Sequence, residues 1–252
     1  GVGAWAGWGE VVALEERVRA AGATMVKSVG GWREARVATI GTAGANSGVG
    51  EISSALAGFV DSAVMASNRI NMPQSAEQVL AETGARLISM ARPFLADPEW
   101  VHKAAAGAAD EINTCIACNQ ACLDHAFVHK TVSCLLNPRA GHETTLTLGP
   151  TRHSRSVAVV GAGPAGLAAA VTAAQRGHRV TLFDSRPVIG GQFDLARRIP
   201  GKEEFSETLR YFTRMLDKHG VEVRLDTHAG LDLLRGYDEV VLATGVAPRM
   251  PD

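Results

Sequence analysis

Four cysteines gather in one short stretch, with the spacing Cys115-x2-Cys118-x3-Cys122-x11-Cys134. A close triplet with a distant fourth thiolate is typical of iron–sulfur clusters, which are commonly held by four cysteines. Structural zinc sites more often use two matched pairs, and disulfides suit small, cysteine-dense secreted domains. The spacing therefore favours a [4Fe–4S] cluster, with zinc as the main alternative and disulfides as the weakest.

Polar groups beside the cysteines fit the same interpretation. Asn119, Gln120 and backbone amides between the ligands can donate hydrogen bonds to sulfur, and such bonds tune the potential of a cluster. His125 and His129 lie inside the same stretch and could ligate a metal. Because four cysteines are available, we expect both histidines to be bystanders.

A glycine fingerprint is the second feature that could do chemistry. An apolar run at 157–160 leads into the motif Gly161-x-Gly163-x-x-Gly166, and an alanine-rich segment follows. The first glycine permits a tight turn, the second lets the backbone approach a pyrophosphate, and the third lets helix pack on strand. A further strand ends at Asp184, about 20 residues on, where an acid is expected to bind ribose hydroxyls. The alternative is a glycine-rich turn that binds no ligand.

Length and composition bound the class of protein. The chain has 252 residues, enough for one large domain or two ordinary ones. Its net charge is −1 without a block of like charges, so we expect no nucleic-acid or membrane-surface partner. No apolar run approaches the roughly 20 residues that span a bilayer. Free thiols and the lack of a signal peptide predict a cytoplasmic protein, and the ends at Gly1 and Asp252 suggest part of a longer one.

The predicted elements alternate between helix and strand. In the first half we expect a helix over 10–21, a strand over 24–26, a glycine-rich loop over 41–50, a strand over 62–66, a helix from Pro73 and a strand over 87–90. Asp97 and Pro98 should be the N-cap and first residue of the next helix. Such alternation predicts a parallel α/β structure.

The second half begins with a region of little regular pattern, 110–150, which carries the cysteines. From Ser156 we expect a nucleotide-binding unit with a strand over 157–160, a strand over 179–183, a turn at 200–201, a helix over 203–219, and strands over 221–225 and 239–243. Glu203 and Glu204 lie favourably at the positive end of that last helix.

Longer stretches carry a family resemblance. They read EINTCIACNQACLDH, SCLLNPRA, VAVVGAGPAG and IGGQFDLARRIPGKEEFSETLRYF. The chain resembles bacterial NADPH-dependent 2,4-dienoyl-CoA reductases, which belong with the old-yellow-enzyme-related iron–sulfur flavoproteins. The resemblance is dense over about residues 85–250 and looser over about 8–84. Three residues separate Cys118 from Cys122, whereas related amine dehydrogenases tend to have two.

The resemblance implies three regions and several cofactors. Residues 1–108 would be the last three βα units of an FMN-type (β/α)8 barrel, 109–152 a [4Fe–4S]-binding linker, and 153–252 a Rossmann-like FAD domain without its NADPH-binding part. In the family, electrons pass from NADPH through FAD and the cluster to FMN, which reduces the unsaturated acyl-CoA.

The resemblance also implies the residues of each site. The cluster ligands would be Cys115, Cys118, Cys122 and Cys134. The FAD contacts would be Gly161, Gly163, Ala165, Gly166, Asp184, Gly191, Gln192 and Lys202. The FMN-phosphate contacts would be Arg69, Ala91 and Arg92. Barrel phosphate sites lie after strands 7 and 8, and the last group follows the second and third predicted strands. The alternatives are solvated arginines and, at Gln192, a turn residue.

Several features depart from the family. A closed barrel needs eight strands, and the sequence predicts three, so FMN should bind weakly or not at all. The two tyrosines, Tyr211 and Tyr237, lie in the FAD region, and Arg33 stands where relatives have a histidine. Arginine is a poor general acid, so we assign no catalytic residue and expect no dienoyl-CoA reduction by this chain alone.

Three other interpretations stay open. The chain could derive from an amine dehydrogenase or an enoate reductase of the same superfamily. It could be a non-catalytic binding module held together by zinc at the four thiolates. Exposed strand edges of an incomplete barrel could also cause it to dimerise or aggregate.

Overall fold

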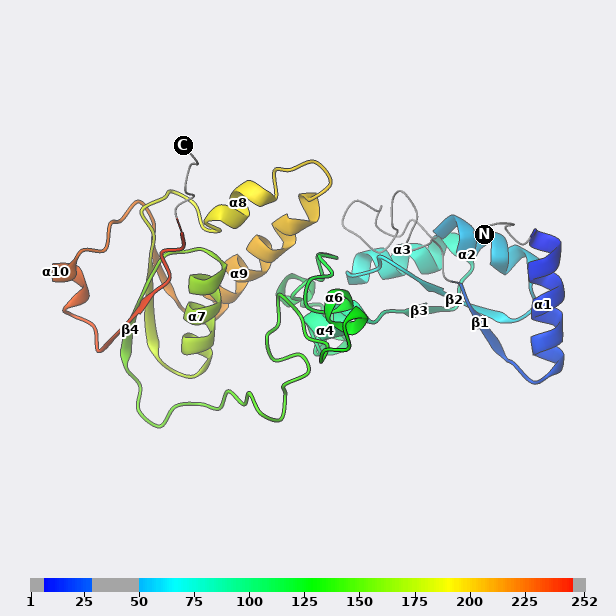
Figure 1. Cartoon of the computed structure of the whole chain (residues 1–252), viewed down its shortest axis with the longest axis horizontal. Helices are drawn as coiled ribbons and strands as arrows, with labels where there is room; N and C mark the ends of the chain where they lie inside the picture. Colours follow the sequence, from blue (N-terminus) through cyan, green and yellow to red (C-terminus); the bar gives the residue numbers. More distant parts are fainter. Residues whose placement is uncertain (1–6, 29–49, 247–252) are drawn as a thin grey trace.

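The computed structural model describes residues 7–28 and 50–246. Their strands form two parallel sheets, one with the order β1-β2-β3 and one with the order β6-β5-β4-β7. Figure 1 shows the two sheets at opposite ends of an elongated molecule, with α4 and α6 between them. The predicted parallel α/β class is confirmed.

The elements of the first sheet and its helices come first along the chain. They are α1 (Trp8–Ala20), β1 (Met25–Lys27), α2 (Gly50–Phe59), β2 (Ala63–Ser67), α3 (Pro73–Thr83) and β3 (Leu87–Ser89). The three predicted strands and the helix from Pro73 are therefore present, with ends shifted by one or two residues. The sequence analysis did not predict α2, and the loop expected over 41–50 lies almost wholly outside the described residues, as does Arg33.

The core of this part lies between the sheet and its helices. Its buried members include Val64 and Ala66 on β2, Val79 on α3, and Trp100 and Ile112 from the segment that follows. By contrast, Leu14 and Val18 of α1 are 63% and 38% exposed.

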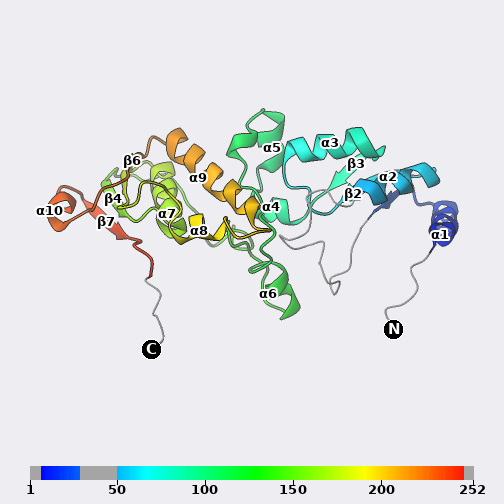
Figure 2. The same cartoon turned by 90° about the horizontal axis from the view of Figure 1, so that it is seen from above.

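The middle segment contains short helices and the cysteine-bearing chain. The helices are α4 (Arg92–Ala96), α5 (Trp100–Ala105), the 3-10 turn η1 (Ala109–Glu111) and α6 (Leu123–Phe127). Figure 2 shows α5 and α6 on opposite sides of the molecule. The prediction for Asp97 was partly wrong, because α5 begins at Trp100 with Glu99 as its N-cap. One Asp97 oxygen accepts a hydrogen bond from the Glu99 amide at 3.0 Å, and the other accepts hydrogen bonds from the Asn113 amide and the Lys103 ammonium.

The second sheet follows, with helices packed on it. Its elements are β4 (Ser156–Val160), α7 (Pro164–Gln175), β5 (Arg179–Phe183), α8 (Gln192–Ala196), the 3-10 turn η2 (Glu203–Phe205), α9 (Ser206–Lys218), β6 (Glu222–Arg224), α10 (Leu231–Leu234) and β7 (Glu239–Leu242). The helix predicted over 203–219 is thus η2 continued by α9. Val159, Leu167, Leu182, Phe212 and Leu216 are central residues of the core.

The described part of the chain has no helix that is both long and apolar enough to cross a membrane.

Candidate functional site: a nucleotide pocket and a cysteine pocket

A pocket of about 630 Å³ opens where β4 turns into α7, at the carboxyl end of the second sheet. Ligands of open parallel sheets bind at this edge. Most of the residues predicted to contact FAD line it, namely Gly161, Gly163, Ala165, Asp184, Gly191 and Gln192. Segments 227–229 and 242–246 also line this nucleotide pocket.

The three glycines of the fingerprint have different physical reasons to be glycine. Gly161 has φ +107°, and a Cβ there would lie 2.3 Å from the Ala243 carbonyl oxygen. A Cβ on Gly166 would lie 1.8 Å from the Gly161 carbonyl oxygen. A Cβ on Gly163 would meet no atom within 4 Å, and its φ of −75° suits any residue. The fold therefore requires Gly161 and Gly166, whereas Gly163 leaves open space in the nucleotide pocket.

Asp184 organises the rim of the nucleotide pocket. Its carboxylate accepts the Ala162 amide at 2.6 Å and the Arg186 amide at 2.8 Å. The Arg186 guanidinium donates to the Gly191 carbonyl at 2.7 Å, and Gln192 donates to the Val246 carbonyl at 2.7 Å. These bonds tie the ends of β5 and β7 to the loop before α8. Arg186 was not among the residues predicted from the sequence to line this pocket.

A buried carboxylate anchors α8 beneath this rim. The Asp194 side chain is 1% exposed and pairs with Arg197 and Arg198 at 2.8 and 2.7 Å. A hydrogen bond from Arg197 lowers the pKa of Asp194, and both arginine charges lower it further against the opposing effect of burial. Lys202, by contrast, lies outside the pocket lining, with its ammonium 5.5 Å from the centre of the Phe205 ring.

A second pocket is lined by all four cysteines. Arg92, Leu95, Ile116, Asn119, Ala121, Leu135 and Leu136 complete its wall. The four thiols are partly buried and form no disulfide. Across the residues that the structure describes, no three His, Cys, Asp or Glu side chains are arranged to hold a single metal ion. All four cysteines thus lie around one pocket, and their role as ligands of one cluster stays a prediction.

Burial and backbone amides set the state of the thiols. Burial raises the pKa of Cys115 to about 11, while the Ala117 amide and the Arg92 charge oppose that rise. Burial also raises the pKa of Cys118, against the Gln120 amide. For Cys115 and Cys118, burial therefore disfavours the thiolate, and a bound metal would offset this desolvation. Amides directed at sulfur are the second-shell groups that cluster sites use.

The backbone of the cysteine loop is strained. Ala117 has φ +51° and Asn119 has φ +63°, although neither is glycine. Alanine rarely adopts the left-handed region, so the surrounding contacts must hold it there. The Asn119 Oδ1 accepts a hydrogen bond from Arg92 at 2.5 Å, and donation by the Asn119 amide nitrogen to sulfur stays a prediction.

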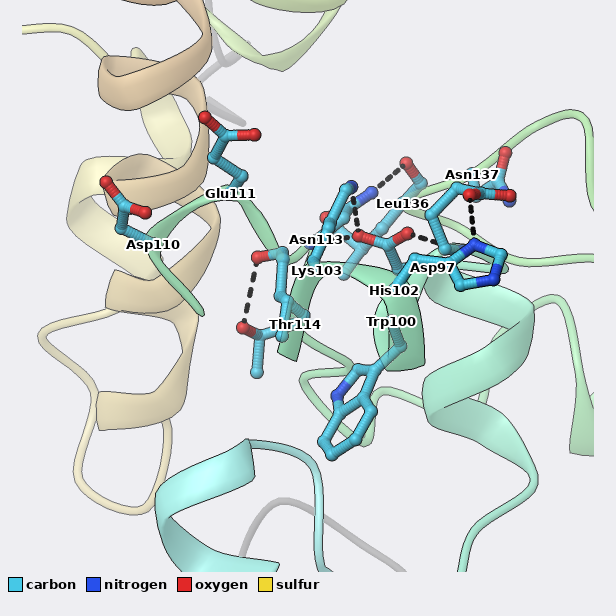
Figure 3. A network of polar contacts seen from close by, with 12 residues as sticks. Asp97, Trp100, His102, Lys103, Asp110, Glu111, Asn113, Thr114, Leu136 and Asn137 are labelled. Carbon is cyan, nitrogen blue, oxygen red and sulfur yellow. Dashed lines mark hydrogen bonds and ion pairs between the residues drawn. The ribbon is translucent and has the colours of Figure 1, made fainter. Parts of the chain in front are cut away.

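A polar network holds the two ends of the cysteine loop together (Figure 3). The Asp97 side chain is 3% exposed and binds the Asn113 amide at 2.8 Å and the Lys103 ammonium at 2.6 Å. Asn113 in turn donates to the Leu136 carbonyl at 3.0 Å, just beyond Cys134. The network therefore closes the loop from Asn113 to Leu136 against α5.

Two family models match the chain. Residues 7–111 match the NADH:flavin oxidoreductase / NADH oxidase family, and residues 159–223 match an NAD(P)-binding Rossmann-like domain. The chain belongs to the NADH:flavin oxidoreductase family. The β1–β3 sheet is thus part of its (β/α)8 barrel, and the β4–β7 sheet is its Rossmann-like unit, as predicted.

Several curated relatives are similar over most of this chain. The metal reductase of Desulforamulus reducens is 39% identical over 236 residues, which cover 91% of this chain and 35% of the relative. The NADH oxidase of Thermoanaerobacter brockii is 38% identical over 72% of this chain and 29% of its own length. The chain therefore spans about a third of the length of these curated relatives.

A solved structure of 2-naphthoyl-CoA reductase in complex with 2-naphthoyl-CoA shares the architecture. It is 32% identical with a TM-score of 0.91, and the match covers 96% of this chain and 38% of that one. The narrower resemblance to 2,4-dienoyl-CoA reductases stays a prediction.

The residues predicted for FMN phosphate lie in two places in the structure. Arg69 follows β2 and forms an ion pair with Glu204 at 2.7 Å. Ala91 is the N-cap of α4, and Arg92 lines the cysteine pocket. The sequence analysis missed the partners of these arginines, because Glu204 and Asn119 are distant from them along the chain.

Proposed function

We propose that this chain is the electron-transfer segment of an NAD(P)H-dependent iron–sulfur flavoprotein. It would bind FAD in the nucleotide pocket and a [4Fe–4S] cluster in the cysteine pocket. The observation that carries this proposal is that one short chain has both pockets, each lined by the residue types that its cofactor requires. When bound, the two cofactors would supply a relay between a two-electron donor and one-electron steps.

The residues around the nucleotide pocket have distinct parts in this proposal. Gly163 leaves room for the pyrophosphate, and the start of α7 supplies free amides near it. Asp184 lies at the end of β5, where an acid can bind ribose, and Gln192 lies at the opposite wall. The position of Lys202 does not support its predicted contact with FAD, because its side chain lies against the Phe205 ring.

The cysteine pocket would hold the cluster through Cys115, Cys118, Cys122 and Cys134. Four cysteines around one pocket, with amides directed at their sulfurs, support this assignment. The backbone N–H groups of residues 136 and 137 act on Cys134 in the same way. Free thiols also suit a reducing compartment, so we place the protein in the cytoplasm.

The longer protein would use this relay to reduce a conjugated acyl-CoA with FMN bound in the complete barrel. The resemblance to 2,4-dienoyl-CoA reductases supports this substrate class, and so does the similarity to 2-naphthoyl-CoA reductase. The proposal that Arg69 and Arg92 bind the FMN phosphate is supported only by their positions after β2 and β3. Both side chains contact other side chains in the structure. NADPH would be the electron donor.

The first test is anaerobic purification of the chain, with iron, sulfide, zinc and released flavin assayed on the same sample. We expect a broad absorption shoulder at about 400 nm, from charge transfer between the thiolates and the iron of the cluster. The same sample should contain iron, sulfide and FAD. Zinc without iron or flavin would instead support the binding-module alternative and overturn the proposal.

A further inference from the structure

The GKEEF segment, residues 201–205, contains a side chain that contacts residues after β2 in the first half of the molecule. Glu204 forms an ion pair with Arg69 at 2.7 Å and accepts a hydrogen bond from the Asn71 side chain at 2.5 Å. The side chains of Arg69 and Glu204 are 4% and 9% exposed. We call this set, Glu204 with Arg69 and Asn71, the Glu204 bridge.

On one side, the Glu204 bridge reaches the cysteine pocket. The Asn71 amide nitrogen that donates to Glu204 also donates to the Cys115 carbonyl at 2.9 Å. The Trp100 indole donates to the Asn71 carbonyl at 2.9 Å, which fixes the backbone of that residue. The position of Cys115 therefore depends on a side chain that Glu204 orients.

On the other side, the Glu204 bridge reaches the nucleotide pocket. Glu204 precedes Phe205, whose ring stacks on Phe193 with centroids 5.0 Å apart and planes 8° apart. Phe193 belongs to α8, and its neighbour Gln192 lines the nucleotide pocket. A continuous set of contacts thus joins the wall of one pocket to a cysteine of the other.

We propose that Glu204 is a positioning residue that sets the placement of the cysteine pocket relative to the nucleotide pocket. This inference rests on the proposed function, in which an electron leaves reduced FAD, the cluster gains it, and the flavin proton goes to solvent. The rate of such a step depends on how rigidly the two sites are held, because small displacements in a site have large effects on rate. Glu204 itself touches neither cofactor site.

Two variants and one matched control test the Glu204 bridge. Glu204→Gln removes the charge that pairs with Arg69. Asn71→Ala removes the bond to Cys115 but keeps the Arg69–Glu204 pair, so it decides the matter if Glu204→Gln does not fold. Glu203→Gln is the control, because Glu203 is an exposed neighbour whose carboxylate accepts a hydrogen bond from the Gly201 amide at 3.0 Å. Arg210, which donates to the Ile112 carbonyl at 2.8 Å, still holds the chain before Cys115 in each variant.

The first readout is hydrogen exchange of residues 112–118 in the purified protein. We expect exchange to become about tenfold faster or more in Glu204→Gln and Asn71→Ala, while β4–β7 and the control stay unchanged. The second readout is stopped-flow transfer from reduced FAD to the cluster, which should slow by about tenfold or more at unchanged FAD and iron content.

Hydrogen exchange and electron transfer at wild-type rates in both variants would overturn the inference. An equally large effect of Glu203→Gln would overturn it as well. A wild-type protein without FAD or iron would overturn the proposed function instead. In that case hydrogen exchange, which requires no cofactor, still decides whether Glu204 positions the cysteine loop.

Discussion

The nucleotide pocket and the cysteine pocket are built in opposite ways. The nucleotide pocket lies at the end of a regular sheet, and its shape depends on missing side chains at Gly161, Gly163 and Gly166. The cysteine pocket lies in an irregular loop, and its shape depends on long-range polar contacts from Asp97 and Asn113. The glycines that shape the first pocket lie within one short motif, whereas the polar groups that shape the second come from separate parts of the chain.

The difference predicts where each pocket is vulnerable. The nucleotide pocket should fail when volume is added, because backbone atoms lie within 2.3 Å of a Cβ built on Gly161 or Gly166. The cysteine pocket should fail when a polar group is removed, because its loop lacks a regular hydrogen-bonded ladder. Four substitutions test this contrast, taken from the largest expected effect to the smallest.

Asp97→Ala should have the largest effect. It leaves the Asn113 amide and the Lys103 ammonium without their buried carboxylate, and the loss of one partner of a buried ion pair costs about 3–5 kcal/mol. We expect that loss in the free energy of unfolding by urea, together with loss of iron binding. Glu99→Ala is the control, since Glu99 is 62% exposed and pairs with His102. Equal midpoints for the two variants would contradict the contrast.

Gly166→Ala should follow. The added Cβ would lie 1.8 Å from the Gly161 carbonyl oxygen, so the β4–α7 turn must shift. Overpacking of this kind costs about 1–3 kcal/mol, and we expect the upper end because the clash is with backbone. Thermal unfolding followed by circular dichroism measures the change. A variant as stable as the wild type would show that the turn is more adaptable than its close contacts indicate.

Gly163→Ala should separate folding from binding. Its Cβ meets nothing within 4 Å, so the free energy of unfolding should change by less than about 1 kcal/mol. The same methyl group enters the space proposed for the pyrophosphate, so FAD affinity should fall by about tenfold or more. Flavin fluorescence titration of the apoprotein measures this affinity, and unchanged FAD binding would refute the assignment of Gly163.

Ala117→Gly should have the smallest effect, and it should stabilise the protein. Ala117 holds φ +51°, a conformation that costs an L-residue roughly 1–2 kcal/mol and glycine almost nothing. The greater entropy of unfolded glycine offsets part of that gain, so we expect a net increase of about 0.5 kcal/mol. Urea unfolding of the metal-free protein measures it, and a decrease would indicate that Ala117 has a packing role.

The sequence predicted best what local chemistry decides. The strands of both sheets were predicted from hydrophobic pattern and are present in the structure. Spacing singled out the fingerprint glycines and the four cysteines, whose roles as cofactor contacts stay predictions. The family follows from the same stretches, and the comparisons support it at the level of flavin oxidoreductases.

The rest could not be predicted because it depends on distant partners. Asp97 has the local signature of an N-cap, yet its second oxygen binds the Asn113 amide, 16 residues away. Arg69 has the signature of a phosphate ligand, yet it pairs with Glu204. Ala117 gives no signal at all, because alanine in the left-handed region has no sequence pattern.

The pairing of Arg69 with Glu204 affects when this part of the protein can fold during synthesis. On the ribosome, Asn71 emerges 133 residues before its Glu204 partner, and the cysteines emerge between the two. Until that carboxylate arrives, the buried guanidinium of Arg69 has no Glu204 to compensate its charge, so the barrel side of the junction stays incomplete during synthesis. The cysteine loop therefore cannot gain the contact that Glu204 supports through Asn71 until residues 201–205 have been made.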